Sequence, residues 1–300
     1  MKKQLLFLVA ALALLLPDAL SARPRPRPQP VGPAELVVLG HAGAGFFTPI
    51  SPFNFRPPSS WQGISYALSL GADGVEIDLQ LSQDSVLMLY HDQTLENSST
   101  GRGCVGQHPA AVLTQLRYRG GWPYDWFHSE RPVTFDTVLA RLGRRPDFPR
   151  LHLDLHEDDQ CAPAGRVDAH ARTPALLREL ARSLARHRVP LAQVLLVTQV
   201  SATVPLARAL VPGLPVSLEI VADDLAAGLQ AAQAAQVTTV VLDADRVTPA
   251  QTAQAHAAGL RVVVFGGRSA KDIRRVLAAA PDEMEADNVR RLLILQQRLR

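Results

Sequence analysis

Short apolar runs alternate with longer amphipathic segments along the chain after residue 35. The runs have the length of strands, whereas the longer segments have the period of helices. This pattern predicts strands over residues 36–39, 75–81, 86–90, 151–155, 194–197, 216–220, 237–242 and 262–265. It predicts helices over residues 60–70, 135–142, 173–187, 202–210, 224–235, 249–258, 270–279 and 288–299.

The order of these elements predicts an α/β protein with parallel strands, because a helix that links two strands forms a right-handed crossover. Eight strands in about 265 residues are typical of a (β/α)8 barrel, the TIM barrel. A doubly wound open sheet is the alternative. The glycines at 40–45 lack the Gly-x-Gly-x-x-Gly order that such a sheet usually has after its first strand. We therefore expect a barrel domain over residues 35–300.

The first 34 residues differ from the rest in composition. Lys2 and Lys3 precede an apolar run over 5–16, and small residues follow it, which is typical of a signal peptide over residues 1–22. An uncleaved membrane anchor is the alternative. Proline and arginine alternate over residues 23–34 and predict an extended spacer. We expect an exported protein, located in the periplasm or outside the cell.

The positive charge of the chain is concentrated at this end. The whole chain carries +3, and the first 27 residues alone contribute an excess of about four positive charges, so the remainder is nearly neutral. A nearly neutral domain gives no reason to expect nucleic-acid binding. The two cysteines, Cys104 and Cys161, either form a disulfide or remain free thiols. They do not resemble a zinc site.

The predicted strand over residues 75–81 carries two carboxylates, Glu76 and Asp78. Alternate side chains of a strand point the same way, so these two converge while their apolar neighbours face the helices. Two buried carboxylates are costly without a cation, and oxygen ligands suit Mg²⁺ or Ca²⁺. The sequence therefore predicts a site for one divalent cation.

Further polar residues stand near the ends of other predicted strands. His41 follows the first strand, His91 follows the third, and Asp154 and His156 belong to the fourth. In a barrel, side chains at the carboxyl ends of the strands meet at one rim. Histidines beside a cation are candidates for proton transfer. This combination predicts an active site.

Two irregular segments, over residues 48–58 and 96–132, follow strands that carry these residues. Long loops at this end of a barrel usually shape the substrate pocket. The second segment is rich in aromatic residues. One expectation is contact with a membrane surface, and the other is a small separate core beneath the loop.

Three segments together resemble the glycerophosphodiester phosphodiesterase family. They are Gly40-His-Ala-Gly43, Gly71-Ala-Asp-Gly-Val-Glu-Ile-Asp-Leu79 and Tyr90-His-Asp-Gln-Thr-Leu-Glu-Asn-Ser-Ser-Thr-Gly-Arg-Gly103. The resemblance implies a TIM barrel, one divalent cation and acid–base catalysis by two histidines. It implies that the cation is held by Glu76, Asp78 and Asp154, and that the histidines are His41 and His91. It leaves open which histidine is the acid and which is the base.

The chain departs from the family pattern around these residues. Ala42 stands where the family usually has Arg, and Pro58 and Ser59 stand where it has Glu and Asn. Asp154 replaces a Glu, and His156 replaces a Lys. Because two expected cationic groups are replaced, we expect His156 and Arg102 to bind the substrate, with Arg268 as a further candidate.

The leading interpretation is an exported, metal-dependent phosphodiesterase. It would hydrolyse small glycerophosphodiesters to an alcohol and glycerol phosphate. One alternative is a phospholipase of the D or C type that acts on intact or lyso phospholipid headgroups, with the aromatic loop facing a membrane. A second alternative is a barrel that binds phosphodiesters without turnover, motivated by the replacements at Ala42 and Pro58.

Overall fold

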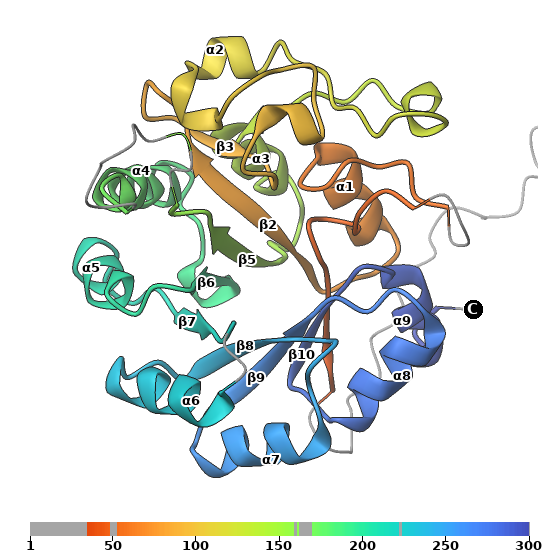
Figure 1. The fold of residues 1–300 in the computed structure, drawn as a ribbon, viewed down its shortest axis with the longest axis vertical. Helices are drawn as coiled ribbons and strands as arrows, with labels where there is room; N and C mark the ends of the chain where they lie inside the picture. Colours follow the sequence, from red (N-terminus) through yellow and green to blue (C-terminus); the bar gives the residue numbers. More distant parts are fainter. Residues whose placement is uncertain (1–34, 49–52, 159–160, 162–169, 222–223, 300) are drawn as a thin grey trace, which may run out of the picture. The chain divides into compact units, whose positions relative to one another are not determined.

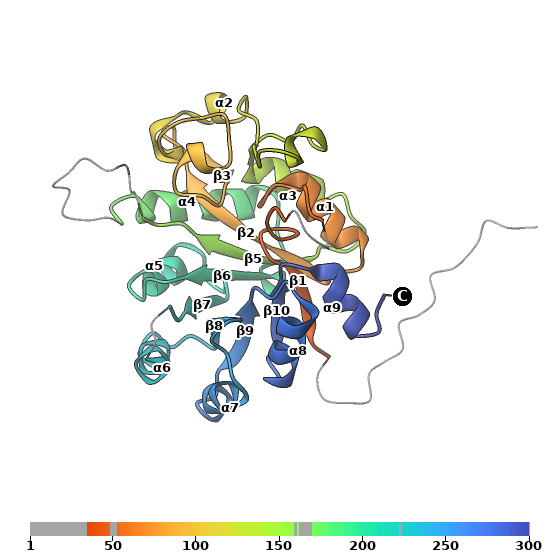
Figure 2. The same cartoon turned by 45° about the vertical axis from the view of Figure 1, so that its right-hand side comes forward.

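A closed ring of eight parallel strands forms the centre of the described part of the chain (Figures 1 and 2). The computed structural model describes residues 35–48, 53–158, 161, 170–221 and 224–299, so the predicted signal peptide and spacer lie outside the described residues. In ring order the strands are β1 (Val37–Gly40), β2 (Gly74–Leu81), β5 (Arg150–Leu155), β6 (Val194–Thr198), β7 (Val216–Glu219), β8 (Thr239–Asp243), β9 (Arg261–Phe265) and β10 (Glu283–Ala286). Pairing of β1 with both β2 and β10 closes the ring.

Helices surround this ring on its outside (Figure 1). They are α1 (Trp61–Ser69), α3 (Phe135–Leu142), α4 (Thr173–Arg186), α5 (Thr203–Leu210), α6 (Leu225–Ala234), α7 (Pro249–Ala257), α8 (Ala270–Ala278) and α9 (Val289–Leu295). The outward side chains of β2, such as Val75 and Ile77, join the same buried core as Ile64 and Ala67 of α1. The prediction of a TIM barrel is confirmed.

Several helices begin at the residue types that the sequence leads one to expect. Ser60, Thr134 and Ser269 each accept a hydrogen bond through the side chain from a backbone N–H three residues later. Such caps satisfy N–H groups that have no partner inside the first turn. The predicted start of α1 at Ser60 is therefore confirmed.

The membership of the barrel differs from the prediction at two strands. The third predicted strand, residues 86–90, is β3 (Leu87–Leu89), which runs antiparallel to β2 and pairs with β4 (Val133–Thr134). The five residues between β2 and β3 are too few for a crossover, so the chain can only turn back. The eighth barrel strand is β10, which the sequence analysis did not predict because Glu-Met-Glu-Ala is not an apolar run.

The long segment between β3 and α3 has a small core of its own, and it contains α2 (Ala110–Leu113) (Figure 2). Met88, Tyr90, Leu95, Val105 and Tyr118 are buried together there. A disulfide joins Cys104 of this segment to Cys161, with the two Cα atoms 5.9 Å apart. A separate core is present, but of the aromatic residues in the segment 96–132 only Tyr118 belongs to it. The structure pairs the two cysteines.

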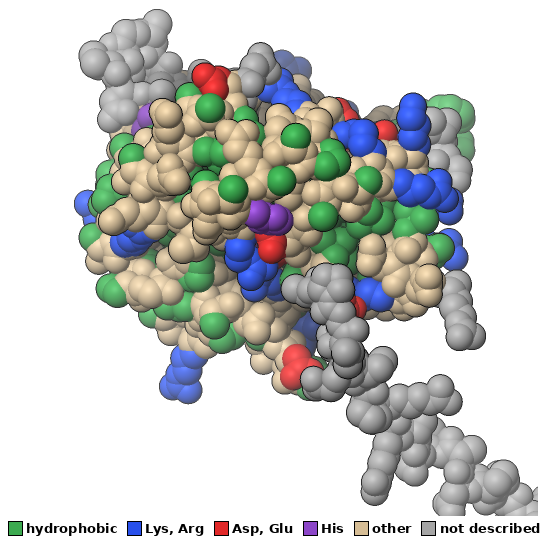
Figure 3. Space-filling model, turned by 90° about the horizontal axis from the view of Figure 1, so that it is seen from below, with side chains coloured by type: hydrophobic (Ala, Val, Ile, Leu, Met, Phe, Trp, Pro, Cys, Tyr) green, Lys and Arg blue, Asp and Glu red, His purple; other side chains and the backbone are tan. Residues whose placement is uncertain are grey.

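The outer surface of the domain is mixed in character. In the face that Figure 3 shows, basic, acidic and apolar side chains are interspersed. Among the described residues, no helix combines the length and the apolar character that are needed to cross a bilayer.

Candidate active site

A cavity of 220 Å³ lies at the carboxyl ends of the barrel strands. Its lining consists of His41, Glu76, Asp78, His91, Asp154, His156, Val197, Gln199, Glu219, Val241, Phe265 and Glu285. The structure thus brings six of the seven predicted site residues together. The seventh, Arg102, is exposed and is not part of the lining, so the structure gives no support to substrate binding by this residue.

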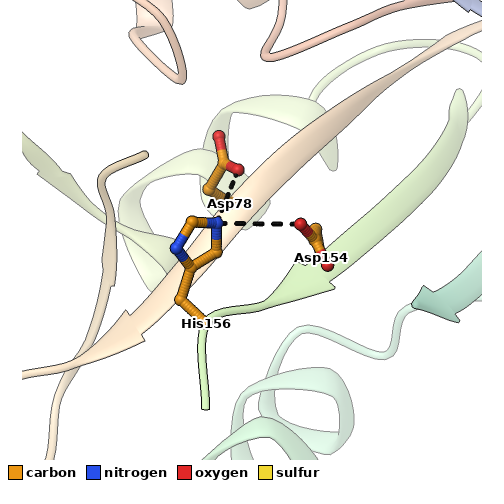
Figure 4. Close-up of side chains that lie close together, drawn as sticks. All are labelled: Asp78, Asp154 and His156. Atoms are coloured by element: carbon orange, nitrogen blue, oxygen red, sulfur yellow. Dashed lines mark hydrogen bonds and ion pairs between the residues drawn. The ribbon is translucent and has the colours of Figure 1, made fainter. Parts of the chain in front are cut away.

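Three of the side chains that line the cavity lie close together (Figure 4). Asp78 of β2 lies opposite Asp154 of β5 in the strand register, so the two carboxylates project at the same level. The Nε2 atom of His156, just after β5, is 3.0 Å from an Asp78 oxygen and 3.6 Å from an Asp154 oxygen. One ligand atom from each of the three lies within 4.8 Å of the others, which suits a metal ion.

Unpaired oxygen atoms in the cavity fit a divalent cation. Glu76 Oε1 and Asp154 Oδ1 are buried and have no hydrogen-bond partner among the described residues. Burial and the neighbouring Asp78 raise the pKa of Glu76 well above its usual value. Burial is also the main cause that raises the pKa of Asp154 to about 6. A hard cation would compensate these carboxylates, because it favours their ionised form and prefers oxygen ligands.

Asp78 differs from these two carboxylates. Burial opposes its charge, but the hydrogen bond and the charge of His156 prevail and hold the pKa of Asp78 below the usual range. Ser59 also contributes, since its hydroxyl donates to Asp78 Oδ2 at 2.5 Å. Asp78 is therefore the carboxylate of this group that the protein itself keeps ionised.

His41, which follows β1, is held by a carboxylate that the sequence prediction missed. Its Nδ1 atom is 2.8 Å from Oδ1 of Asp287, the residue directly after β10. Burial disfavours the imidazolium, but the hydrogen bond and charge of Asp287 outweigh it and raise the pKa of His41 to about 9. His41 therefore carries a proton that it can donate.

His91 reaches the cavity from the antiparallel hairpin and not from a barrel strand. Its Nδ1 atom lies 3.1 Å from Oδ1 of Asp92. The Phe46 ring packs against both histidines, with its centroid 5.2 Å from that of His41 and 4.7 Å from that of His91. Both imidazoles thus contact the same aromatic ring.

The connection between β1 and α1 places two further donors on the carboxylates. The backbone N–H of Ala42 donates to Glu76 Oε2 at 2.6 Å, next to the Ser59 contact with Asp78. Ala42 and Ser59 have φ values of 43° and 50°, a left-handed conformation that costs about 1 kcal/mol or more outside glycine. At these two replaced family positions, the backbone conformation turns polar groups toward the carboxylates.

Two more carboxylates line the cavity and were not predicted as site residues. Glu219 ends β7, and burial together with the Asp154 charge raises its pKa to about 8. Glu285 of β10 lies 2.5 Å from Nδ1 of the buried His152. Glu219 could have been predicted as a site residue, because it is an acidic residue near the end of the predicted strand 216–220. Glu285 could not, because its strand was not predicted.

The sequence matches the family described as "Glycerophosphoryl diester phosphodiesterase family" over residues 55–291. A probable glycerophosphodiester phosphodiesterase 1 from Mycobacterium tuberculosis is 41% identical over 71 residues, which are 24% of this chain and 26% of that protein. The matched segments span 26% to 42% of the lengths of the curated relatives.

Solved structures with a similar fold cover nearly the whole of the described barrel. A putative glycerophosphoryl diester phosphodiesterase from Silicibacter pomeroyi has a TM-score of 0.74 at 20% identity, and the match covers 89% of this chain and 96% of that one. A phosphodiesterase from Oleispira antarctica, solved with the product sn-glycerol-3-phosphate, has a TM-score of 0.70 at 19% identity, with 87% and 96% covered. Because the family match includes most of the sequence, this chain belongs to the glycerophosphoryl diester phosphodiesterase family.

Proposed function

We propose that this protein is an exported, metal-dependent phosphodiesterase that hydrolyses glycerophosphodiesters to an alcohol and glycerol phosphate. The main observation is that three histidines, including His41 and His91, and a set of buried, partly unpaired carboxylates line one cavity. Membership of the family supports this reaction class. The product complex of the Oleispira antarctica phosphodiesterase supports the substrate class.

Glu76, Asp78 and Asp154 are the residues that we propose to hold the divalent cation, with His156 beside them. When bound, the cation supplies positive charge to the phosphate oxygens, where negative charge increases in the transition state. His156 lies 3.0 Å from Asp78, and burial is outweighed by the Asp78 hydrogen bond, which raises the pKa of His156 to about 9. In this proposal His156 keeps its proton and is not a ligand of the cation, so it supplies a second positive charge near the phosphate.

His41 is the general acid in this proposal and His91 is the general base. His91 accepts a proton from the attacking hydroxyl, either of water or of the substrate, as its oxygen bonds to phosphorus. The bond from phosphorus to the alcohol oxygen breaks, and His41 donates its proton to that oxygen. Asp287 keeps the proton on His41 before this step, since it holds Nδ1 at 2.8 Å.

Two features support export. The composition of residues 1–22 is typical of a signal peptide. The disulfide between Cys104 and Cys161 fits an oxidising compartment, because cytosolic thiols are usually kept reduced.

The proposed reaction is tested with bis(p-nitrophenyl) phosphate and a panel of glycerophosphodiesters in the presence of Mg²⁺, Ca²⁺ or Mn²⁺. We expect turnover with at least one metal, and a loss of at least about 100-fold in kcat for His41→Ala and for His91→Ala. Both variants should bind metal with nearly wild-type affinity in a calorimetric titration, whereas Asp154→Asn should bind it more weakly. Absence of turnover with every metal in folded protein would leave only a binding role.

A second candidate function is action on lipid headgroups at a membrane surface. Trp122 and Trp126 are 78% and 75% exposed, and Phe127 beside them is also exposed. The Phe127 ring packs 5.3 Å from Phe53, on the segment that also carries Phe46. Exposed tryptophans of this kind insert well at a membrane interface, where one part of the ring is dry and the other wet. The cluster therefore favours lyso phospholipids as alternative substrates.

Sedimentation with anionic phospholipid vesicles tests this candidate. We expect the wild-type protein to bind the vesicles and the double variant Trp122→Ala/Trp126→Ala to lose most of this binding. Val112→Ala, at another exposed apolar residue, is the matched control and should bind like the wild type. Equal sedimentation of all three proteins would remove the membrane role, whereas turnover of the soluble diester would be unaffected by this outcome.

A further inference from the structure

We propose that Glu219 and Phe265 form a subsite for a positively charged alcohol, so that the preferred substrates are phosphodiesters with an ammonium headgroup. The inference rests on the proposed phosphodiesterase function and names the substrate class of the same cavity. It depends on the charge of the cavity, on the apolar wall next to Glu219 and on the position of both relative to His41.

The cavity contains more negative charge than its positive side chains balance. Five carboxylates line it, and the lining formed by the described residues includes no lysine or arginine. Four of the carboxylates lie within 4.0 Å of a histidine nitrogen, namely Glu76, Asp78, Asp154 and Glu285. Glu219 forms no ion pair with any residue that the structure describes, and it accepts one hydrogen bond, from the Gln199 amide at 3.2 Å. Among the five carboxylates of the lining, Glu219 is thus the one that can form an ion pair with a positively charged ligand.

Apolar side chains surround Glu219 on the neighbouring strands. Val241 of β8 is its partner in the strand register, and Val197 of β6 lies on the other side of β7. Together with Phe265 of β9, these residues line the same cavity. A carboxylate among aliphatic groups and an aromatic ring suits an ammonium group, which gains from the charge and from the face of the ring. A neutral polyol would find few hydrogen-bond partners on this wall.

The subsite adjoins the group that we propose to protonate the leaving alcohol. The Phe265 ring centroid lies 5.5 Å from that of His41. An alcohol whose oxygen faces His41 is therefore next to Phe265, in the cavity that Glu219 also lines. A bound positive charge also favours the ionised form of Glu219, because an opposite charge lowers the pKa of a carboxyl group.

The test compares glycerophosphocholine with glycerophosphoglycerol, whose headgroup is uncharged, as substrates of the full-length, metal-loaded protein. In Glu219→Gln we expect the ratio of kcat/KM for the first substrate to that for the second to fall by about tenfold or more, mainly through KM. Glu219→Asp, which keeps the charge, should recover part of the ratio. Glu179→Gln on α4 is the matched control, since Glu179 pairs with Arg182 outside the cavity, and its ratio should equal that of the wild type.

The ratio of kcat/KM values and a titration with choline distinguish failure of the subsite from failure of the proposed phosphodiesterase function. An equal loss on both substrates, or a loss of bound metal in Glu219→Gln with a constant ratio, overturns the subsite but not the phosphodiesterase function. If the wild type hydrolyses neither substrate, the proposed function fails, and a calorimetric titration with choline then decides the subsite alone. Binding of choline that weakens about tenfold in Glu219→Gln supports it. Absence of choline binding by the wild type overturns it.

Discussion

At the scale of single residues, the site depends on partners that the sequence does not place near the motif. His41, Glu76 and Asp78 could be predicted because their residue types and spacing on strands have a chemical meaning by themselves. Asp287 and Ser59 could not, because they act through contacts with residues far away in the sequence. An aspartate after a strand or a serine after a proline is common in loops and turns. The contacts of Asp287 with His41 and of Ser59 with Asp78 are therefore visible only in the folded barrel.

The contact between Asp287 and His41 leads to a prediction about pH. In Asp287→Asn the imidazolium of His41 loses the carboxylate that raises its pKa to about 9, so this pKa should fall. We expect kcat to decrease by about 10- to 100-fold, as is usual when the partner of a functional histidine is removed. The limb of the pH–rate profile that belongs to His41 should move to lower pH.

A second histidine–aspartate pair provides the control for this prediction. His256 lies 2.9 Å from Asp282, which precedes β10 and does not line the cavity. Asp282→Asn removes the same kind of contact and should leave the profile where it is in the wild type. A profile of Asp287→Asn that has the wild-type shape and position would show that Asp287 does not tune His41.

At the scale of elements, β10 shows why the strand prediction was incomplete. Its charged residues, Glu283 and Glu285, are almost fully buried, while Met284 between them belongs to the outer core. The carboxylates contact Arg150 and His152 of β5 across the barrel interior. A pattern search for apolar runs misses such a strand, because the charges are compensated by residues that are distant in the sequence.

This buried ion pair predicts a dependence of stability on pH. Burial opposes the charge of Glu283, but His152 and Arg150 prevail and lower its pKa below the usual 4.5. A carboxylate with a lowered pKa stabilises the folded state above its unfolded-state pKa and loses this effect as the pH falls through the folded-state value. In Glu283→Gln the free energy of unfolding at pH 7 should therefore fall by about 2–3 kcal/mol, less than for a fully buried pair because Arg150 is partly exposed.

Chemical denaturation at several pH values checks this expectation. The difference between the wild type and Glu283→Gln should shrink as the pH falls from about 4.5 through the lowered folded-state pKa of Glu283, since the wild-type side chain then becomes neutral as well. Glu179→Gln is again a suitable control, because its partner Arg182 is exposed and such a surface pair contributes little. A difference that stays constant from pH 7 to pH 3 would contradict the assigned role of the Glu283 charge.

At the scale of the whole molecule, alternation of apolar runs and helices was enough to predict the barrel. The number of strands was right although one member was wrong, because the hairpin strand β3 and the barrel strand β10 exchanged places in the count. The pattern gave no means of telling a strand that crosses over from one that turns back, except the length of its connection. The exposure of Trp122 and Trp126 in the aromatic segment agrees with the sequence pattern, whereas the burial of Tyr118 in a small separate core depends on contacts that the pattern does not show.

The disulfide between Cys104 and Cys161 connects the segments that follow β3 and β5, and these same segments carry His91 and His156. In the proposed exported protein, this link between the two halves of the site forms only where an oxidant is available. The positions of His91 and His156 would then be fixed by a covalent link only after export to an oxidising compartment, so activity would be highest in that compartment.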